Sequence, residues 1–394
     1  MSRRLAVVLI TVAIASAGRP ALPAAAQKAD PWEILKKIVL VPGVSRHEAK
    51  ASDFVQAALP SSFKVQRDAQ HNVWFTVGSG RPHLLFVAHI DELGWTVESV
   101  TSQGRARLRG TGGLLAQTLP GRAVLIHTAG GPVAGVIAPR PGYDERRPEG
   151  QTPAAQPAAA VPPAAPAAAQ APAQPASPRV VEDFEVELGV ATEAEAAALG
   201  VKAGDPVTAK KALWELSPDI LTARAVDDRA GCAALLAAAL RLDWSRVRGG
   251  TMTFAWDVQE ETGLNGAREL AKTLTPDYVF AIDTFVSSDS PLESKRLAYT
   301  PVGGGMVIRA SDSSSLVPKA QLERVLGLAR GRGIPVQVGS SRGGNDGSVF
   351  VPLGAVDIPL SWPGAYAHSL IEKIDRHDLE ALTNLIVALV EEWR

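Results

Sequence analysis

The chain is poor in cysteine, aromatic residues and net charge, and each shortage argues against a class of protein. Cys232 is its single cysteine, which excludes an intrachain disulfide and a cysteine-rich metal cluster. The formal net charge of −1 gives no basic excess for nucleic acid, and no nucleic-acid-binding motif is present. Aromatic residues make up 5% of the chain, few for the platforms on which sugars stack. What remains is ordinary globular composition, 46% hydrophobic and 21% charged.

Long apolar runs are also missing beyond the first residues. The chain starts with Arg3 and Arg4, an apolar stretch "LAVVLITVAIASA", and small residues before Gln27. This order is typical of a secretory signal peptide, here residues 1–26. No later apolar run is long enough to cross a bilayer. We therefore expect a periplasmic or secreted protein without a membrane segment after signal cleavage.

Residues 153–178 consist almost entirely of alanine, proline and glutamine. Proline at this density interrupts helices and strand ladders, and the other residues offer little to a core, which predicts an extended loop. Short β-like segments with glycine turns flank this Pro/Ala loop on both sides. We interpret it as an insertion in one small β-rich module at about residues 97–215, rather than as a linker between domains.

The rest of the chain alternates strands and helices. The stretches "HLLFVAHID" (83–91), "TMTFAWDV" (251–258) and "DYVFAID" (277–283) are near-continuous apolar runs, as expected of strands buried on both faces. Helical segments lie between them. The alternation predicts an α/β domain with a mainly parallel central sheet flanked by helices, split into residues 28–96 and 216–394 by the β-rich module.

Acidic residues and histidines gather where the predicted strands end and helices begin. They are His89, Asp91, Glu92, Asp227, Asp228, Glu260, Glu261, Asp283 and His368. In open α/β sheets, ligands bind beyond the carboxyl ends of the strands. Crowded carboxylates repel one another unless a cation lies among them. Two imidazoles with three carboxylates suit a pair of divalent ions such as Zn²⁺ or Co²⁺.

The adjacent glutamates Glu260 and Glu261 fit two-metal hydrolysis. In such sites one carboxylate bridges the metals, and a further carboxylate that is not a ligand takes the proton from water. Neighbouring side chains in an extended backbone point apart. One glutamate can therefore bind metal while the other faces the water and the substrate.

Six motifs resemble, in order along the chain, those of the family M42 metallo-aminopeptidases, which include the tetrahedral (TET) aminopeptidases. They are "AHIDELGW", "AVDDRAGCAAL", "QEETGLNGA", "AIDTF", "GGNDGS" and "AYAHSLIEKIDRHDL". The resemblance runs from about Lys36 to the C-terminus, apart from the Pro/Ala loop. It implies a zinc-exopeptidase-like fold, with the β-rich module as lid and dimerisation domain. It also implies a homo-oligomer that removes N-terminal residues from peptides.

The resemblance also implies roles for individual residues. Carried over position by position, the metal ligands would be His89, Asp227, Glu261, Asp283 and His368. Asp227 would bridge two divalent ions, Zn²⁺ or Co²⁺, with Mn²⁺ as a further candidate. Glu260 would be the general base, and Asp91 would orient His89, since ligand histidines usually need such a partner.

The chain departs from the family pattern in three places. The family's "GGTD" reads "GGND" at residues 343–346. The Pro/Ala loop falls in the lid, near where family members build their assemblies. The expected signal peptide is absent from most members, which are cytosolic. These differences bear on substrate preference and oligomeric state rather than on the metals.

Parts of the sequence also fit three other functions. A serine hydrolase would use Ser341 in "GSSRG", with Asp357 and His368 following in order, but a nucleophile elbow needs a helix after the serine and "RGGNDG" is poor helix material. A glycosidase would use Glu260 and Glu261. Its two carboxylates must flank the scissile bond about 5–10 Å apart, and residues adjacent in the sequence are badly placed for that. A non-catalytic binding protein of the same fold would lack a ligand or Glu260, and none is missing.

Overall fold

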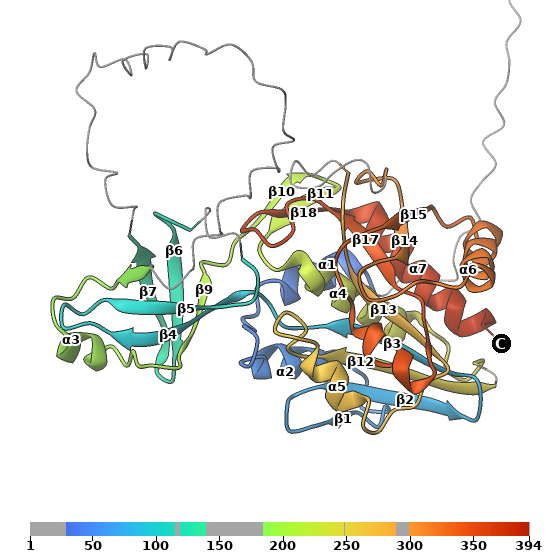
Figure 1. The fold of residues 1–394 in the computed structure, drawn as a ribbon, viewed down its shortest axis with the longest axis horizontal. Coiled ribbons are helices and arrows are strands. Elements are labelled where there is room, and N and C mark those ends of the chain that lie inside the picture. Colours follow the sequence, from blue (N-terminus) through green and yellow to red (C-terminus); the bar gives the residue numbers. More distant parts are fainter. Residues whose placement is uncertain (1–28, 115–118, 139–183, 248, 289–298, 394) are drawn as a thin grey trace, which may run out of the picture.

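The computed structural model describes residues 29–114, 119–138, 184–247, 249–288 and 299–393. Figure 1 shows an elongated molecule, with a small β-barrel at one end and a larger α/β unit at the other. The predicted signal peptide and the Pro/Ala loop lie outside the described residues, so both stay predictions. The α/β class with a mainly parallel central sheet is confirmed.

The larger unit, which we call the catalytic unit, takes elements from both ends of the chain. Its helices are α1 (Pro31–Ile38), α2 (Ala49–Ala58), α4 (Val226–Arg241), α5 (Asn265–Leu270), α6 (Lys319–Gly331) and α7 (Arg376–Glu392), with the 3-10 turns η3 (Asp346–Val349) and η4 (Val351–Leu353). Its main strands are β1 (Gln66–Arg67), β2 (Val73–Ser79), β3 (His83–His89), β12 (Gly250–Asp257), β13 (Tyr278–Val286), β14 (Met306–Ser311), β15 (Val336–Ser340), β16 (Val356–Asp357) and β17 (Leu360–Gly364). A small separate sheet contains β10 (Leu213–Ser217), β11 (Ile220–Ala223) and β18 (Glu372–Asp375).

The central sheet brings the ends of its inner strands together. Its order is β1-β2-β12-β3-β13-β17-β14-β15, with β16 beside β13. The four strands β12, β3, β13 and β17 run parallel. The register pairs Asp257 with His89 and Ala88 with Ile282. The carboxyl ends of β12, β3 and β13 therefore meet at one edge of the sheet.

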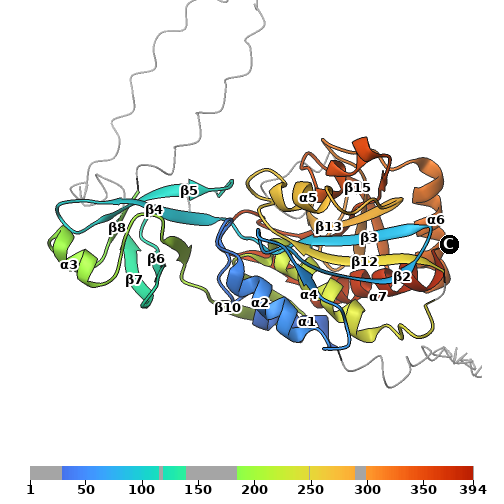
Figure 2. The ribbon, with the colours of Figure 1, turned by 90° about the horizontal axis from the view of Figure 1, so that it is seen from below.

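Helices cover both faces of this sheet. The helices α1, α4 and α7 pack on one face, and α5 lies on the other with η3 (Figure 2). Helix α4 is rich in alanine, the best helix former, and its residues from Val226 to Ala239 are all buried. Because the stretch of α4 from Ala230 to Ala239 is apolar all round, it can pack against the sheet, α1 and α7 at once.

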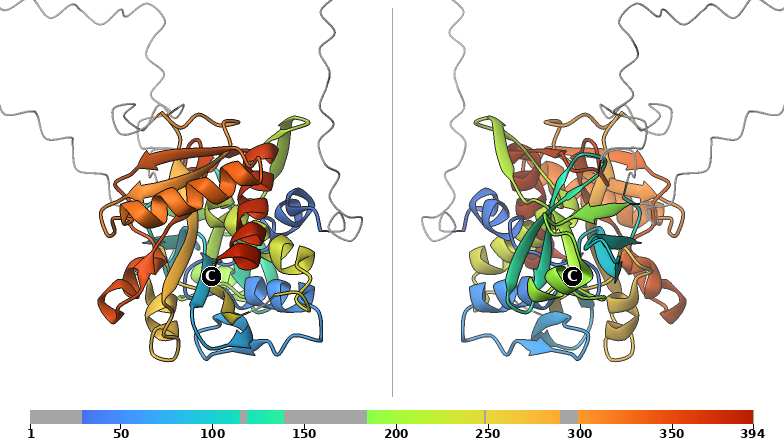
Figure 3. Two further views of the ribbon diagram at one scale, coloured as in Figure 1. Left: turned by 90° about the vertical axis from the view of Figure 1, so that its right-hand side faces the viewer. Right: turned by 90° about the vertical axis from the view of Figure 1, so that its left-hand side faces the viewer.

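The barrel has its own core. It is closed in the order β4-β5-β8-β7-β6-β9, with strands β4 (Gly94–Val100), β5 (Ala106–Thr111), β6 (Ala123–Thr128), β7 (Gly131–Ile137), β8 (Glu185–Glu187) and β9 (Pro206–Ala209) and the helix α3 (Glu193–Ala198). Trp95, Leu108 and Ile126 are buried inside it. Figure 3, right, looks along the molecule with the barrel in front of the catalytic unit.

The limits of the barrel differ slightly from the expected module at 97–215. Its strands run from Gly94 to Ala209, and β10 pairs with β11 beside β18 instead. Apolar alternation identifies a strand but does not say which sheet the strand joins. None of the helices in the described ranges has the length and apolar composition that a bilayer crossing needs.

Candidate metal centre

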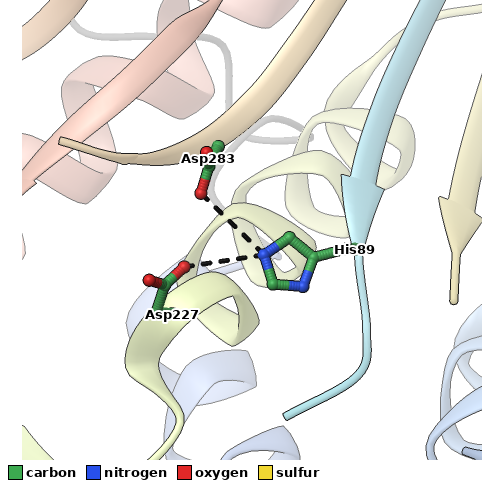
Figure 4. A group of neighbouring side chains, drawn as sticks. All are labelled: His89, Asp227 and Asp283. Carbon is green, nitrogen blue, oxygen red and sulfur yellow. Dashed lines mark ion pairs between the residues drawn. The ribbon is translucent and has the colours of Figure 1, made fainter. Parts of the chain in front are cut away.

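Three side chains from three elements converge beyond the sheet edge. His89 ends β3, Asp283 lies near the end of β13, and Asp227 lies in the first turn of α4 (Figure 4). His89 Nε2 is 3.6 Å from Asp227 Oδ1 and 3.8 Å from Asp283 Oδ1. These separations are long for hydrogen bonds, but ligands of one tetrahedral ion lie roughly 3.3–3.6 Å apart. We call these three residues the inner group.

A second group shares one residue with the first. His368 Nε2 lies 3.7 Å from Asp227 Oδ2 and 3.7 Å from Glu261 Oε2. We call Asp227, Glu261 and His368 the outer group. The ligand atoms within each group all lie within 4.8 Å of one another. Asp227 thus turns one oxygen to each group, as a bridging carboxylate would.

The buried carboxylate of Glu372 fixes two members of the outer group. Its Oε2 accepts the backbone N–H of Asp227 at 3.0 Å, and its Oε1 accepts that of His368 at 2.9 Å. Glu372 belongs to β18, which pairs with β11 just ahead of α4. The small sheet therefore sets the separation between Asp227 and His368.

The carboxylate of Asp91 contacts both His89 and the loop that carries Glu260 and Glu261. Its Oδ1 lies 3.4 Å from His89 Nδ1 and accepts the backbone N–H of Glu260 at 3.0 Å. Its Oδ2 accepts the backbone N–H of Glu261 at 3.3 Å and the hydroxyl of Ser45. Asp91 is fully buried, so these contacts lack competition from water. One carboxylate therefore orients both a histidine of the inner group and the loop that carries the two glutamates.

Arg309 supports Asp283. Its Nη2 donates to Asp283 Oδ2 at 3.0 Å, while Asp283 Oδ1 faces His89. Its Nη1 donates to the carbonyl of Gly344 at 2.8 Å. The guanidinium is 2% exposed, and its charge offsets that of the carboxylate. The other oxygen of Asp283, Oδ1, faces the inner group and also accepts the backbone N–H of Thr284 at 2.6 Å.

The centre holds more negative charge than its own cations neutralise. Burial, reinforced by nearby carboxylates and opposed by His89, raises the pKa of Glu260 well above its ordinary value. Burial, Asp227 and Glu260 do the same to the pKa of Glu261. Asp227 Oδ1 is buried and has no hydrogen-bond partner among the described residues. An orphaned oxygen among crowded carboxylates fits a site for divalent cations.

The barrel reaches the outer group. Gly112 and Gly113 follow β5, and a Cβ on Gly113 would lie 3.4 Å from His368 Nδ1. A Cβ on Gly112 would lie 3.4 Å from the carbonyl oxygen of Glu261. Leu93 and Leu114 line a small cavity of about 10 Å³ together with Asp227 and Glu261. The barrel therefore forms one wall of the candidate centre.

Two further acids named from the sequence, Asp228 and Glu92, have other partners. Asp228 accepts the backbone N–H of Gly231 at 3.0 Å, where the regular turns of α4 begin after the non-helical Asp227 and Asp228. Glu92 pairs with Lys211 and Arg224, each at 2.6 Å. Glu92 therefore joins the chain segments that enter and leave the barrel.

The serine-hydrolase arrangement is not assembled. Ser341 follows β15, but the next residues do not form a helix. Its buried Oγ has no hydrogen-bond partner in the described part of the chain, and His368 faces Asp227 and Glu261 instead. The sequence reasoning also missed Arg309, Glu372 and Ser45. A lone arginine in the apolar strand "MVIRAS" was the available signal for Arg309.

Comparisons with known proteins agree with this geometry. The family model described as M42 glutamyl aminopeptidase matches residues 72–161 and 158–385. Lysyl aminopeptidase of Pyrococcus furiosus is 26% identical over 370 residues, covering 92% of this chain and 97% of that protein. The putative aminopeptidase SgcX of Escherichia coli is 26% identical over 363 residues, covering 88% and 89%.

A solved structure is also similar. The TET1 peptidase of Pyrococcus horikoshii, whose structure shows that it can assemble into a tetrahedron or a large octahedral shell, has a TM-score of 0.78 and 31% identity. The match covers 92% of this chain and 99% of that one. With the family model matching most of the chain, this protein belongs to the M42 family of metallo-aminopeptidases.

Proposed function

We propose that this aminopeptidase works with two divalent ions and with Glu260 as its general base. The observation that carries the proposal is Asp227, whose two oxygens face the inner and the outer group. Each group combines one imidazole with carboxylates, a donor set that suits Zn²⁺ or Co²⁺, with Mn²⁺ as a further candidate.

The ligands would divide between the two groups. His89 and Asp283 would hold one ion, Glu261 and His368 the other, and Asp227 both. When bound, such a pair polarises the peptide carbonyl and lowers the pKa of a water molecule.

Glu260 is left to move the proton. It belongs to neither group, and its backbone N–H donates a hydrogen bond to Asp91 Oδ1 at 3.0 Å. Its carboxylate would accept the proton of the attacking water and deliver it to the leaving amine, which becomes the new N-terminus. Asp91 would keep His89 oriented throughout.

The substrate would be a peptide with a free N-terminus, admitted beside the barrel wall. A homo-oligomer is supported by the assemblies named for the Pyrococcus horikoshii TET1 peptidase. We further propose export to the periplasm or the exterior, because residues 1–26 have the order of a signal peptide.

The decisive experiment compares Glu260→Gln with Glu261→Gln. Turnover of aminoacyl-anilides and metal content by elemental analysis are measured for both variants. Glu260→Gln should keep the wild-type metal content and lose roughly 10²–10⁴-fold in turnover, as is typical of general-base removal. Glu261→Gln should lose metal, and excess metal should partly restore its activity.

The opposite pattern would reverse the two roles. Activity unchanged in both variants would place the reaction elsewhere. Chelation supplies the matching control, because it should abolish hydrolysis and Zn²⁺, Co²⁺ or Mn²⁺ should restore it. An enzyme indifferent to chelator but inactivated by a serine-directed reagent would favour Ser341.

A further inference from the structure

A cavity at the junction of the two units has no role in the mechanism above. Its volume is about 380 Å³. His127 and Thr128 of β6 form its barrel side, and Arg46, His47 and Lys50 line it from the catalytic unit. We call it the junction cavity.

The lining of the junction cavity carries cations but no acid. No aspartate or glutamate is among its lining residues. Arg46 and Lys50 are exposed, and within the described ranges neither side chain forms an ion pair. Arg46 has φ 75, and His71, which also lines the cavity, has φ 79. Left-handed backbone is unfavourable for such side chains, and it concentrates where a site requires it.

Buried cations lie behind the cavity wall. Lys211 and Arg224 both pair with Glu92 at 2.6 Å. Nη2 of Arg229 lies against Gly43 in the wall, only 2.5 Å from where a Cβ would stand. Two of these cations therefore share one carboxylate, and Arg229 donates from Nη1 to the carbonyl oxygens of Ile38 and Val41. This excess of buried positive charge favours an anion over a cation in the cavity.

The same features argue against a metal ion there. Nε2 of His127 pairs with Thr208 Oγ1 at 3.0 Å, and Nδ1 of His71 with Nη2 of Arg67 at 3.0 Å. Burial, together with Lys50, Lys211 and Arg224 and against Glu92, lowers the pKa of His127 to about 4. A neutral imidazole still donates one hydrogen bond. Cationic surroundings repel a metal and attract an anion.

We propose that the junction cavity binds a small oxyanion, a phosphate or a carboxylate. Arg46 and Lys50 supply the positive charge. His127 supplies a hydrogen bond from the barrel through Nδ1 when its Nε2 accepts from Thr208 Oγ1. The anion thereby ties the barrel to the catalytic unit. Ser45, next to Arg46, donates a hydrogen bond to Asp91, and Asp91 accepts the backbone N–H of Glu260. The loop that carries Arg46 therefore connects the junction cavity to the candidate metal centre. This inference does not depend on the metal mechanism.

Calorimetric titration of the metal-loaded, full-length protein tests the proposal. The probes are inorganic phosphate, N-acetyl-glycylglycine and the amide of that dipeptide. The acetyl group blocks hydrolysis, and the amide removes the carboxylate. We expect phosphate or the acid to bind and the amide not to bind. The anion that binds more tightly shows whether the natural ligand is a phosphate or a carboxylate.

Matched variants locate the binding. Lys50→Gln and Arg46→Gln should each weaken binding roughly tenfold, because each removes one charged hydrogen-bond donor. Lys319→Gln on α6, 88% exposed and outside the cavity lining, should bind like the wild type. Circular dichroism checks that each variant folds.

Three results would overturn the proposal. One is that neither phosphate nor the acid binds at concentrations up to about 10 mM. Another is equal binding by all variants, which would place the anion elsewhere, for example at the metal centre. The third is uptake of an additional divalent ion that His127→Ala abolishes, which would make the cavity a cation site.

Discussion

The inner and outer groups share Asp227 but are built in different ways. The side chain of His89 is 2% exposed at the end of a central strand, whereas that of His368 is 43% exposed on a loop at φ 60. Asp283 is held by the buried Arg309, and Glu261 lies on the loop after β12. The register of the sheet therefore fixes the inner group, while loops, β18 and the barrel fix the outer one.

The comparison indicates how such a centre divides its tasks. Ligands held rigidly in advance bind an ion with a smaller loss of freedom. We therefore expect the inner group to retain its ion more firmly and the outer group, beside the barrel wall, to exchange its ion more readily.

The largest effect should come from the shared residue. Asp227→Asn removes a charge from both groups, so metal content should fall at both and turnover should drop by at least roughly 10²–10⁴-fold. Elemental analysis and anilide hydrolysis measure the two losses. Glu323→Gln on α6, 65% exposed, is the control. Loss of a single ion would show that Asp227 serves only one group.

The two histidines should fail differently. His368→Gln should lose the outer ion and recover part of its turnover in excess metal, because its surroundings are open. His89→Gln should not recover, because it leaves buried carboxylates without their imidazole. Turnover across a metal titration separates the two. Equal recovery by both variants would remove the distinction between the groups.

Substitution of Arg309 should affect the inner group and leave the outer group unchanged. Arg309→Gln should lower metal affinity there roughly 10–100-fold, the usual cost of removing a partner of a ligand. A competing chelator measures the affinity. Arg332→Gln, which removes an exposed pair with Glu391, is the matched control. A loss confined to the outer group would contradict the assignment.

The smallest effect should come from the barrel wall. Gly113→Ala places a methyl group 3.4 Å from His368 Nδ1, which requires only a slight adjustment. A change of a few-fold in KM at unchanged metal content is expected, since small overpacking costs on the order of 1 kcal/mol. Gly327→Ala on α6 meets nothing within 4 Å and should leave the kinetics unchanged.

Much of the arrangement could be predicted from sequence because strand ends are visible there. The apolar runs ending at His89 and Asp283 predict a parallel sheet, and such sheets gather ligands at one edge. The α/β class and the M42 family follow from that pattern and the motifs.

The supporting residues could not be predicted in the same way. Glu372 and Ser45 act through hydrogen bonds to residues 145 and 46 positions away, and no local pattern marks such contacts. The sheet that β10 joins is not visible in the sequence either, because its residues alternate in the same way whichever sheet they join. These features depend on hydrogen bonds and strand pairing between distant residues, rather than on the local helix or strand propensity of the sequence.

Anomalous X-ray scattering at the zinc edge, from crystals grown with Zn²⁺, tests the central claim most directly. The account predicts two peaks, one on each side of Asp227. One should lie about 2.0–2.2 Å from ligand atoms of His89 and Asp283, the other at the same distance from His368 and Glu261. A single peak, or peaks away from Asp227, would contradict the shared-carboxylate centre.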